Sequence, residues 1–340
     1  MKHLSVGAAA PVPSIRRREP LPSPRERRFL HTAQARRLIA ATALALAGPA
    51  ALAEEPDDLL SYEASPEFKF VGNGGFAWQG EADIDGGGTM QVTRYDATVG
   101  FQAALGEKVT WLNTFFVGLS NYEFDGGGFA EGNPWDTVLF NRYGTQFAYQ
   151  VDEHWGVRAG GVFMFSRETS ADWTDGFTGG GSLGVDYRHS KTLFISLGLA
   201  LVSQIEESAR VEPVVAVNWV PAEQWLLRVG AIPVSGGAAA AAEVEYQFTE
   251  QWNVGLGLLF NQRRFRLDDA ELAPNGVGED TSLPLRARVG WNLTPQVSVN
   301  FLAGVVLGGQ LQLDDENGNQ LLKEDYDPAP YIGIRAAGRF

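Results

Sequence analysis

The sequence predicts an all-β fold, a transmembrane antiparallel up-and-down β-barrel of about fourteen strands, with limits of about twelve and sixteen. Three observations predict it. From residue 66 onward, segments of roughly 10–14 residues alternate apolar with polar or small side chains and end at Gly, Pro, Asp or Asn. Short connections alternate with longer, acidic ones. Tryptophans gather beside the short connections.

The composition agrees with this class. The chain has 340 residues, 40 glycines and no cysteine, so disulfides cannot stabilise it. Residues 1–53 carry nine Lys/Arg and two Asp/Glu, which leaves 18 and 39 in residues 54–340, a net charge of −21. Such an acidic chain is not expected to bind nucleic acid. No run of ~18 apolar residues predicts a membrane-spanning helix, and a barrel strand shows lipid only every second side chain.

The N-terminus reads as an export signal. Arg36-Arg37 precede an apolar run of about a dozen residues, which ends in Ala51-Leu52-Ala53 before Glu54. We therefore expect residues 1–53 to be a signal peptide with an extended basic n-region, cleaved near Ala53. Residues 54–65 would be a short periplasmic segment and residues 66–340 the barrel.

The strands follow from the alternation. In residues 283–293, the apolar side chains of Leu283, Leu285 and Val289 share one face, and Arg286 and Arg288 lie on the other. The same reasoning predicts strands near 66–79, 89–104, 108–122, 137–150, 155–167, 177–189, 191–203, 210–220, 224–234, 237–249, 251–267, 281–293, 296–312 and 329–340. An even number places both ends of the chain in the periplasm. The sheet must close, because a free edge in lipid leaves N–H and C=O groups unpaired.

The connections differ in length between the two predicted ends. The short ones are 106–108, 151–154, 189–191, 221–224, 249–251 and 294–296. The longer, acidic ones are 80–88, 123–136, 167–176, 204–209, 268–280 and 314–327, with a short one near 235–237. Outer-membrane barrels have short periplasmic turns and longer extracellular loops. None of the loops is long enough to predict a segment that folds into the lumen.

Aromatic residues support the same orientation. An aromatic girdle is predicted beside the short turns, formed by Trp111, Trp155, Trp219, Trp225, Trp252 and Trp291. Trp78, Trp135 and Trp173 lie near the longer loops and predict a second girdle. The alternative is that these rings pack in the core of a soluble β protein. Phe340 ends an alternating final strand and resembles the signal that the barrel-assembly machinery reads.

Taken together, these features make residues 66–340 resemble a bacterial outer-membrane barrel that is porin-like. The C-terminal half, including the segments 228–233 and 260–267, is similar to a family of uncharacterised outer-membrane barrels. This resemblance implies a location in the bacterial outer membrane, in contact with its lipid and lipopolysaccharide. It implies no substrate and no catalytic residues.

The polar face of the strands predicts the lining of the lumen. The charged residues on this polar face are Arg94, Asp96, Arg142, Arg158, Asp186, Arg188, Arg228, Glu243, Glu245, Arg286, Arg288 and Arg335. Charges inside a barrel must be paired or hydrated. In one interpretation they line a water-filled path and make the barrel a passive, charge-influenced channel for small solutes. In the other, ion pairs fill the lumen of a non-conducting structural or surface-binding barrel.

An enzyme is not expected. A lipid hydrolase would need a histidine beside a serine, and beyond the signal only His154 and His189 remain, both in predicted periplasmic turns. No metal or cofactor is predicted, because the acidic, Gly-rich loops lack EF-hand spacing.

Overall fold

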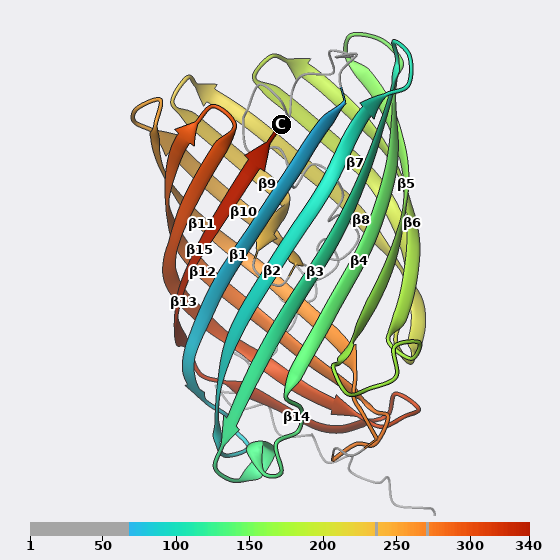
Figure 1. Ribbon diagram of the computed structural model, residues 1–340, viewed down its shortest axis with the longest axis vertical. Coiled ribbons are helices and arrows are strands. Elements are labelled where there is room, and N and C mark those ends of the chain that lie inside the picture. Colours follow the sequence, from blue (N-terminus) through green and yellow to red (C-terminus); the bar gives the residue numbers. More distant parts are fainter. Residues whose placement is uncertain (1–67, 235–236, 270–271) are drawn as a thin grey trace, which may run out of the picture. The chain divides into compact units, whose positions relative to one another are not determined.

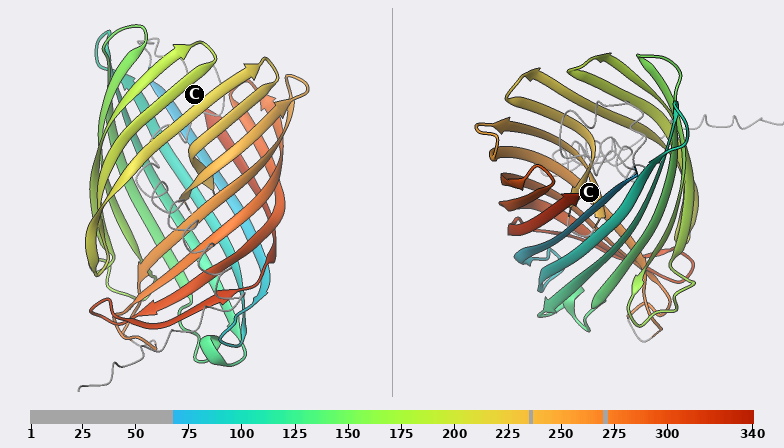
Figure 2. Two further views of the ribbon diagram at one scale, coloured as in Figure 1. Left: turned by 180° about the vertical axis from the view of Figure 1, so that it is seen from behind. Right: turned by 45° about the horizontal axis from the view of Figure 1, so that its top comes forward.

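The computed structural model describes residues 68–234, 237–269 and 272–340, and these residues form a closed antiparallel barrel of fourteen strands (Figure 1). The view in which the top is turned forward shows the strands arranged as a ring (Figure 2). The all-β prediction is therefore confirmed. The expected signal peptide, its cleavage near Ala53 and the segment 54–65 lie outside the described residues.

The strands match the predicted segments closely. They are β1 (Lys69–Asp83), β2 (Thr89–Ala104), β3 (Val109–Asp125), β4 (Thr137–Gln150), β5 (Trp155–Glu168), β6 (Phe177–Ser190), β7 (Leu193–Gln204), β8 (Glu207–Ala222), β9 (Trp225–Val234), β10 (Gly237–Gln247), β11 (Trp252–Arg266), β12 (Val277–Thr294), β13 (Val297–Asp314), β14 (Gln320–Tyr326) and β15 (Ala329–Arg339). One short 3-10 helix, η2 (Gly128–Ala130), lies between β3 and β4.

The ring closes between the first and last strands. Consecutive strands pair from β1 to β13, and β15 pairs with both β13 and β1, the latter from Val71↔Arg339 to Gln79↔Tyr331. The short strand β14 pairs with the end of β13, from Gly309 to Asp314. β14 and β15 therefore occupy one place in the ring, which reconciles fifteen segments with fourteen barrel strands.

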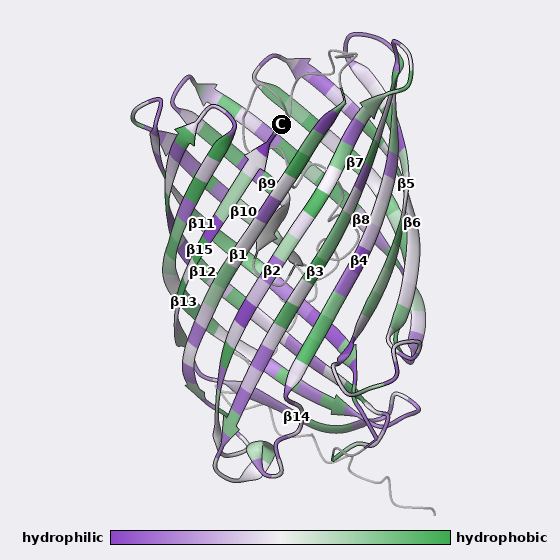
Figure 3. Cartoon of the chain, viewed as in Figure 1, coloured by the Kyte–Doolittle hydropathy of each residue, from purple (hydrophilic) through white to green (hydrophobic). Residues whose placement is uncertain are grey.

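The alternation has the expected consequence for burial. Large apolar side chains face outward and are exposed, for example Val99, Leu183 and Val211, whereas their polar neighbours face inward and are buried, for example Ser196 and Asn300. Figure 3 shows apolar and polar residues alternating along the strands. An apolar outer surface around a polar interior is the arrangement that lipid requires of a barrel.

The two ends of the barrel differ. The short turns and the C-terminus lie at one end, which we call the turn end and which is at the top of Figure 1. The longer connections and η2 lie at the opposite end, the loop end. There the connections are shorter than predicted, because the strands run further. Residues 204–209 reduce to 205–206, 268–280 to 267–276, and 314–327 to 315–319 followed by strand β14.

The strands that form the barrel wall differ in length around the ring. β9 and β10 have 10 and 11 residues, whereas β12 and β13 have 18 each. The surplus strand at the loop end forms a small four-stranded sheet from residues 261–266, 277–282, 309–314 and 320–326, which we call the flap. The flap slopes across the loop end (Figure 1). One edge of the flap is the end of β11. This edge reaches β5, which is six places away in the ring, and Arg266 and Arg167 are bridge partners there.

Candidate functional site

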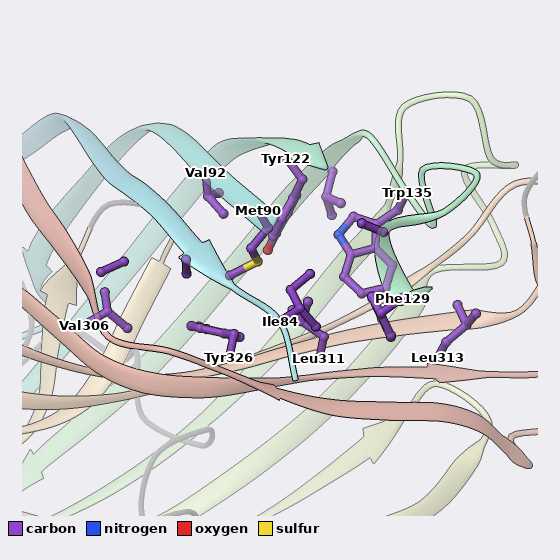
Figure 4. Packing of buried hydrophobic residues seen from close by; sticks show 14 of the residues in the cluster. Ile84, Met90, Val92, Tyr122, Phe129, Trp135, Val306, Leu311, Leu313 and Tyr326 are labelled. Atoms are coloured by element: carbon purple, nitrogen blue, oxygen red, sulfur yellow. The ribbon is translucent and has the colours of Figure 1, made fainter. Parts of the chain in front are cut away.

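The lumen of the barrel is closed at the loop end by a cluster of apolar side chains, which we call the apolar seal. Its members come from the first four strands, from β13 and β15 of the wall, from the flap and from the loop connections: Ala77, Ala82, Ile84, Met90, Val92, Tyr122, Phe129, Ala130, Trp135, Val138, Phe265, Leu267, Ala273, Leu302, Val306, Leu311, Leu313, Tyr326, Ala329 and Tyr331. Figure 4 shows how they converge. Water is excluded here because nearly all of these side chains are fully buried.

Trp135 lies at the centre of the seal and is 0% exposed. Its ring meets those of Phe124, Phe129 and Phe265 edge-on, at centroid distances of 5.4, 5.7 and 5.3 Å. Edge-to-face packing of this kind adds to the gain from burial. The placement corrects two predictions. Trp135 is not part of an outer girdle, and the β3–β4 connection does send side chains into the lumen. The loop is short, but η2 turns Phe129 inward.

A buried carboxylate sits directly beside the seal. Asp280, on the flap, is 0% exposed and accepts hydrogen bonds from Arg94 at 2.9 Å and from the hydroxyl groups of Tyr122 at 2.9 Å and Tyr326 at 3.2 Å. Arg263 lies 4.0 Å from the same carboxylate. The cluster joins the flap to the barrel wall, because Arg94 and Tyr122 belong to β2 and β3. A buried carboxylate is stable only with such partners.

The far edge of the flap is held by side chains rather than by a strand ladder. The hydroxyl of Ser166 donates to the carbonyl of Arg264 at 2.8 Å, and Arg264 donates to the carbonyl of Ile205 at 2.9 Å. Arg266 forms an ion pair with Glu206. Glu168 also accepts backbone N–H groups from two loop connections, at residues 136 and 268.

The structure places all twelve residues predicted to line the lumen in buried or half-buried positions. Most of them are brought together as ion pairs: Arg335–Asp96 at 2.8 Å, Arg158–Asp186 at 3.2 Å, Arg286–Glu243 at 3.1 Å, Arg288–Glu243 at 3.3 Å and Arg228–Glu245 at 3.2 Å. Arg94 pairs with Asp280 instead of a residue of the predicted set. Arg188 is half-buried on β6.

Arg142 differs from the other inward arginines. Its guanidinium lies over the ring of Phe116, 5.2 Å from the centroid. Within the described residues no carboxylate forms an ion pair with it, and its Nε is buried without a hydrogen-bond partner. Arg142 therefore contributes an unneutralised positive charge to the inner face.

Among the described residues, the turn end of the lumen is polar and contains a cavity. A cavity of about 540 Å³ is lined by Arg228, Arg288 and Arg335 together with Glu245 and Asn300. Arg228, Arg288, Arg335 and Glu245 take part in the ion pairs described above. These ion pairs therefore border the cavity at this end. The contrast with the apolar seal divides the lumen into a closed and an accessible part.

Several residues of the inner face were missed in the sequence. They are Gln79, Tyr122, Glu212, Arg263, Asp280 and Tyr326. Asp280 was assigned to a loop, so its face was not considered. Continuing the alternation of β12 backwards from Arg286 through residues 284 and 282 would have placed Asp280 inward. Tyr122 and Arg263 are also found by extending the faces of β3 and β11.

The six tryptophans predicted for the girdle all lie at the turn end and are half-buried or exposed. Several stack on neighbouring rings, as Trp252 does on Trp291 at 5.5 Å and Trp111 on Phe147 at 5.9 Å. Phe340 is 74% exposed, and its backbone exchanges two hydrogen bonds with Phe70. The last residue thus takes part in closing the barrel.

The described part of the chain shows where the histidines and the candidate metal-binding side chains lie. His154 and His189 are both exposed at the turn end. No three His, Cys, Asp or Glu side chains among the described residues are grouped so that they could hold a metal ion. In the part of the chain that the structure describes, there is also no helix with the length and apolarity needed to cross a membrane.

These features define a transmembrane β-barrel of the bacterial outer-membrane type: a closed sheet, an apolar outer face, aromatic rings at the turn end and a polar interior. No protein-family model and no curated protein sequence matches the chain. The similarity of segments 228–233 and 260–267 to an uncharacterised family thus stays a prediction.

Solved structures resemble the barrel as a whole. An outer-membrane channel from Pseudomonas putida F1 is 11% identical, with 82% of this chain and 98% of the other covered and a TM-score of 0.44. A FadL homologue from Pseudomonas aeruginosa is 8% identical, with 85% and 95% covered and a TM-score of 0.45. The toluene transporter TodX from P. putida is 12% identical, with 88% and 97% covered and a TM-score of 0.42. The fold assignment rests on the pairing of this chain's own strands.

Proposed function

We propose that the protein is an outer-membrane channel for small solutes and that its lumen favours anions. The observation that carries this proposal is the charge of the inner face. The predicted lining contains eight arginines and four carboxylates, and the structure adds the buried residues Arg263, Arg266, Glu168, Glu212, Asp280 and Asp314, so ten arginines face eight carboxylates and positive charge is in excess. The rest of the barrel is strongly acidic, so this excess is confined to the lumen. Fixed charges along a narrow path select ions of opposite sign.

Arg142 gives the sharpest test, because it has no carboxylate partner in the described chain. The protein, refolded into a planar bilayer, is measured in a KCl gradient. We expect a reversal potential on the chloride side, and we expect Arg142→Gln to shift it toward zero while Arg142→Lys preserves it. Arg210→Gln is the matched control, because Arg210 is exposed and pairs with Glu207, three residues earlier on the same strand, β8. An unchanged reversal potential in Arg142→Gln would remove Arg142 from the ion path.

A second candidate is a structural barrel that conducts nothing. The apolar seal favours it, because its buried side chains block the loop end. Complete silence of the refolded protein in the bilayer, at every voltage tried and also in variants that loosen the loop end, would support this candidate and contradict the channel.

We further propose that Phe340 is read by the barrel-assembly machinery and that the outer surface contacts outer-membrane lipid and lipopolysaccharide. The exposed ring of Phe340 on the closing strand supports the first proposal. Replacing Phe340 with Ala should lower the amount of folded protein in the outer membrane of cells, while refolding of the purified protein stays unchanged.

A further inference from the structure

We propose that the flap is a gate: it turns as one unit about a line of breaks in β12–β15, and Asp280 latches it to the barrel wall. This inference rests on the proposed channel function and explains how a channel with a sealed loop end would open. It assigns a role to Asp280, Arg94 and Tyr122 that goes beyond filling the lumen.

The breaks lie side by side across the sheet. On β12, the register to β13 shifts between Ser282 and Pro284. On β13, Gly308 has φ 125°, a conformation that residues with a side chain rarely adopt. On the last strand, the segment 327–328, which contains Pro328, separates β14 from β15. Prolines lack the N–H that a ladder needs, and bulges bend the strand that carries them. The breaks therefore mark a hinge.

The flap itself is continuous. β12 pairs with β13 from Val277↔Asp314 to Ser282↔Gly309, and β13 pairs with β14 over the same residues. The pairing of β13 with β14 has one register shift, between Leu313 and Asp314 at the end away from the breaks, and is otherwise regular, so the flap moves as a body more easily than it deforms. Beyond Phe260, β11 has no pairing with β10 in the described chain, so the flap is not tied to the low part of the wall.

The latch joins the two parts across the hinge. Asp280 and Tyr326 are carried by the flap, whereas Arg94 and Tyr122 are carried by β2 and β3 of the wall. Opening would expose Asp280 and Arg94 to water, and hydration would offset much of the lost attraction between them. Opening would also separate Phe265, Leu311 and Leu313 of the flap from the rest of the apolar seal, so the closed state is the more stable of the two. The far edge, held by one bridge and by side chains, can separate without breaking a ladder.

The chain contains no cysteine, so a reversible lock can be introduced without background reactivity. Arg167→Cys with Arg266→Cys places two thiols on bridge partners of the wall and the flap. We expect oxidation to lower the open fraction in planar bilayers at least tenfold and a reductant to restore it. The matched control is Glu279→Cys with Gln312→Cys, a pair of partners that both lie within the flap. Its disulfide should leave the open fraction unchanged.

A single substitution tests the latch. Asp280→Asn should raise the open fraction, whereas Asp152→Asn, in an exposed turn at the opposite end, should not. If wild-type protein conducts and the oxidised wall-to-flap pair conducts equally, the gate is wrong and the channel stands. If no variant conducts, including Asp280→Asn and the reduced pair, both proposals fail. Conductance that appears only in Asp280→Asn and the reduced pair supports the gate directly.

Discussion

At the loop end, the inward side chains include Met90, Tyr122 and Leu311, which are almost completely buried, whereas at the turn end they include Arg228 and Glu245, which line a cavity of about 540 Å³. Both sets lie on the inward face of alternating strands, the first on β2, β3 and β13 and the second on β9 and β10. The alternation thus decides which side chains point inward but not whether water follows them. Water is excluded at the loop end because the flap and η2 add apolar groups from outside the wall.

The largest expected effect concerns the tryptophan at the centre of the apolar seal. Trp135→Ala should lower the free energy of unfolding by about 4 kcal/mol, because it empties the centre of the apolar seal. Trp173→Ala is the control, because Trp173 is 63% exposed near the same end. Urea unfolding in lipid bilayers, followed by far-UV circular dichroism, measures both. Similar losses for the two variants would show that Trp135 does not hold the seal together.

A smaller effect is expected from the carboxylates. Asp280→Asn should cost about 3 kcal/mol of unfolding free energy, because it leaves Arg94 buried without its counter-charge. Glu245→Gln should cost about 1 kcal/mol, because Arg288 keeps its second partner Glu243 and the other partner, Arg228, borders the cavity. The same unfolding measurement compares them. If Glu245→Gln proved the more costly, the ion pairs of the turn end would be shielded from water.

The sequence predicted the strands well because each barrel strand carries its own signal. Two of them, 89–104 and 137–150, have the predicted bounds, and the closure of the sheet follows from lipid alone. The inward arginines were found because they alternate with apolar residues on strands that cross the membrane. The alternation of apolar and polar residues was therefore sufficient to predict the strands wherever one face of the strand contacts hydrocarbon.

The flap could not be predicted in this way. Outside the lipid, both faces of a strand can be polar, so the segment 320–326 has no apolar alternation and was assigned to a loop. The location of Trp135 could not be predicted from the sequence pattern either. Its position near a long loop is compatible with either a girdle or the lumen, and only the path of η2 decides between them. Contacts between distant loop segments leave no periodic signal.

The smallest expected effect sharpens the comparison by testing whether the turns at the two ends are alike. At the loop end, the side chain and backbone N–H groups of Asn319 donate to Asp315, with a further bond from Asn317, and together they lower the pKa of that carboxyl. At the turn end, the backbone N–H groups of His154 and Trp155 lower the pKa of Asp152 in the same way.

A lowered pKa means that the charged carboxylate supports each turn at neutral pH. This support is present above the ordinary pKa of about 3.9 and is lost as the pH falls through the lowered value in the folded protein. Carboxyl carbon shifts measured by NMR should therefore titrate below the ordinary value at both residues, and Asn319→Ala should move the midpoint of Asp315 upward without affecting Asp152. If Asp315 titrated at the ordinary value while Asp152 titrated below it, the hydrogen bonds in the hairpin turn of the flap would be weaker than those in the turn at the opposite end. The difference between the two ends would then include the connections as well as the lumen.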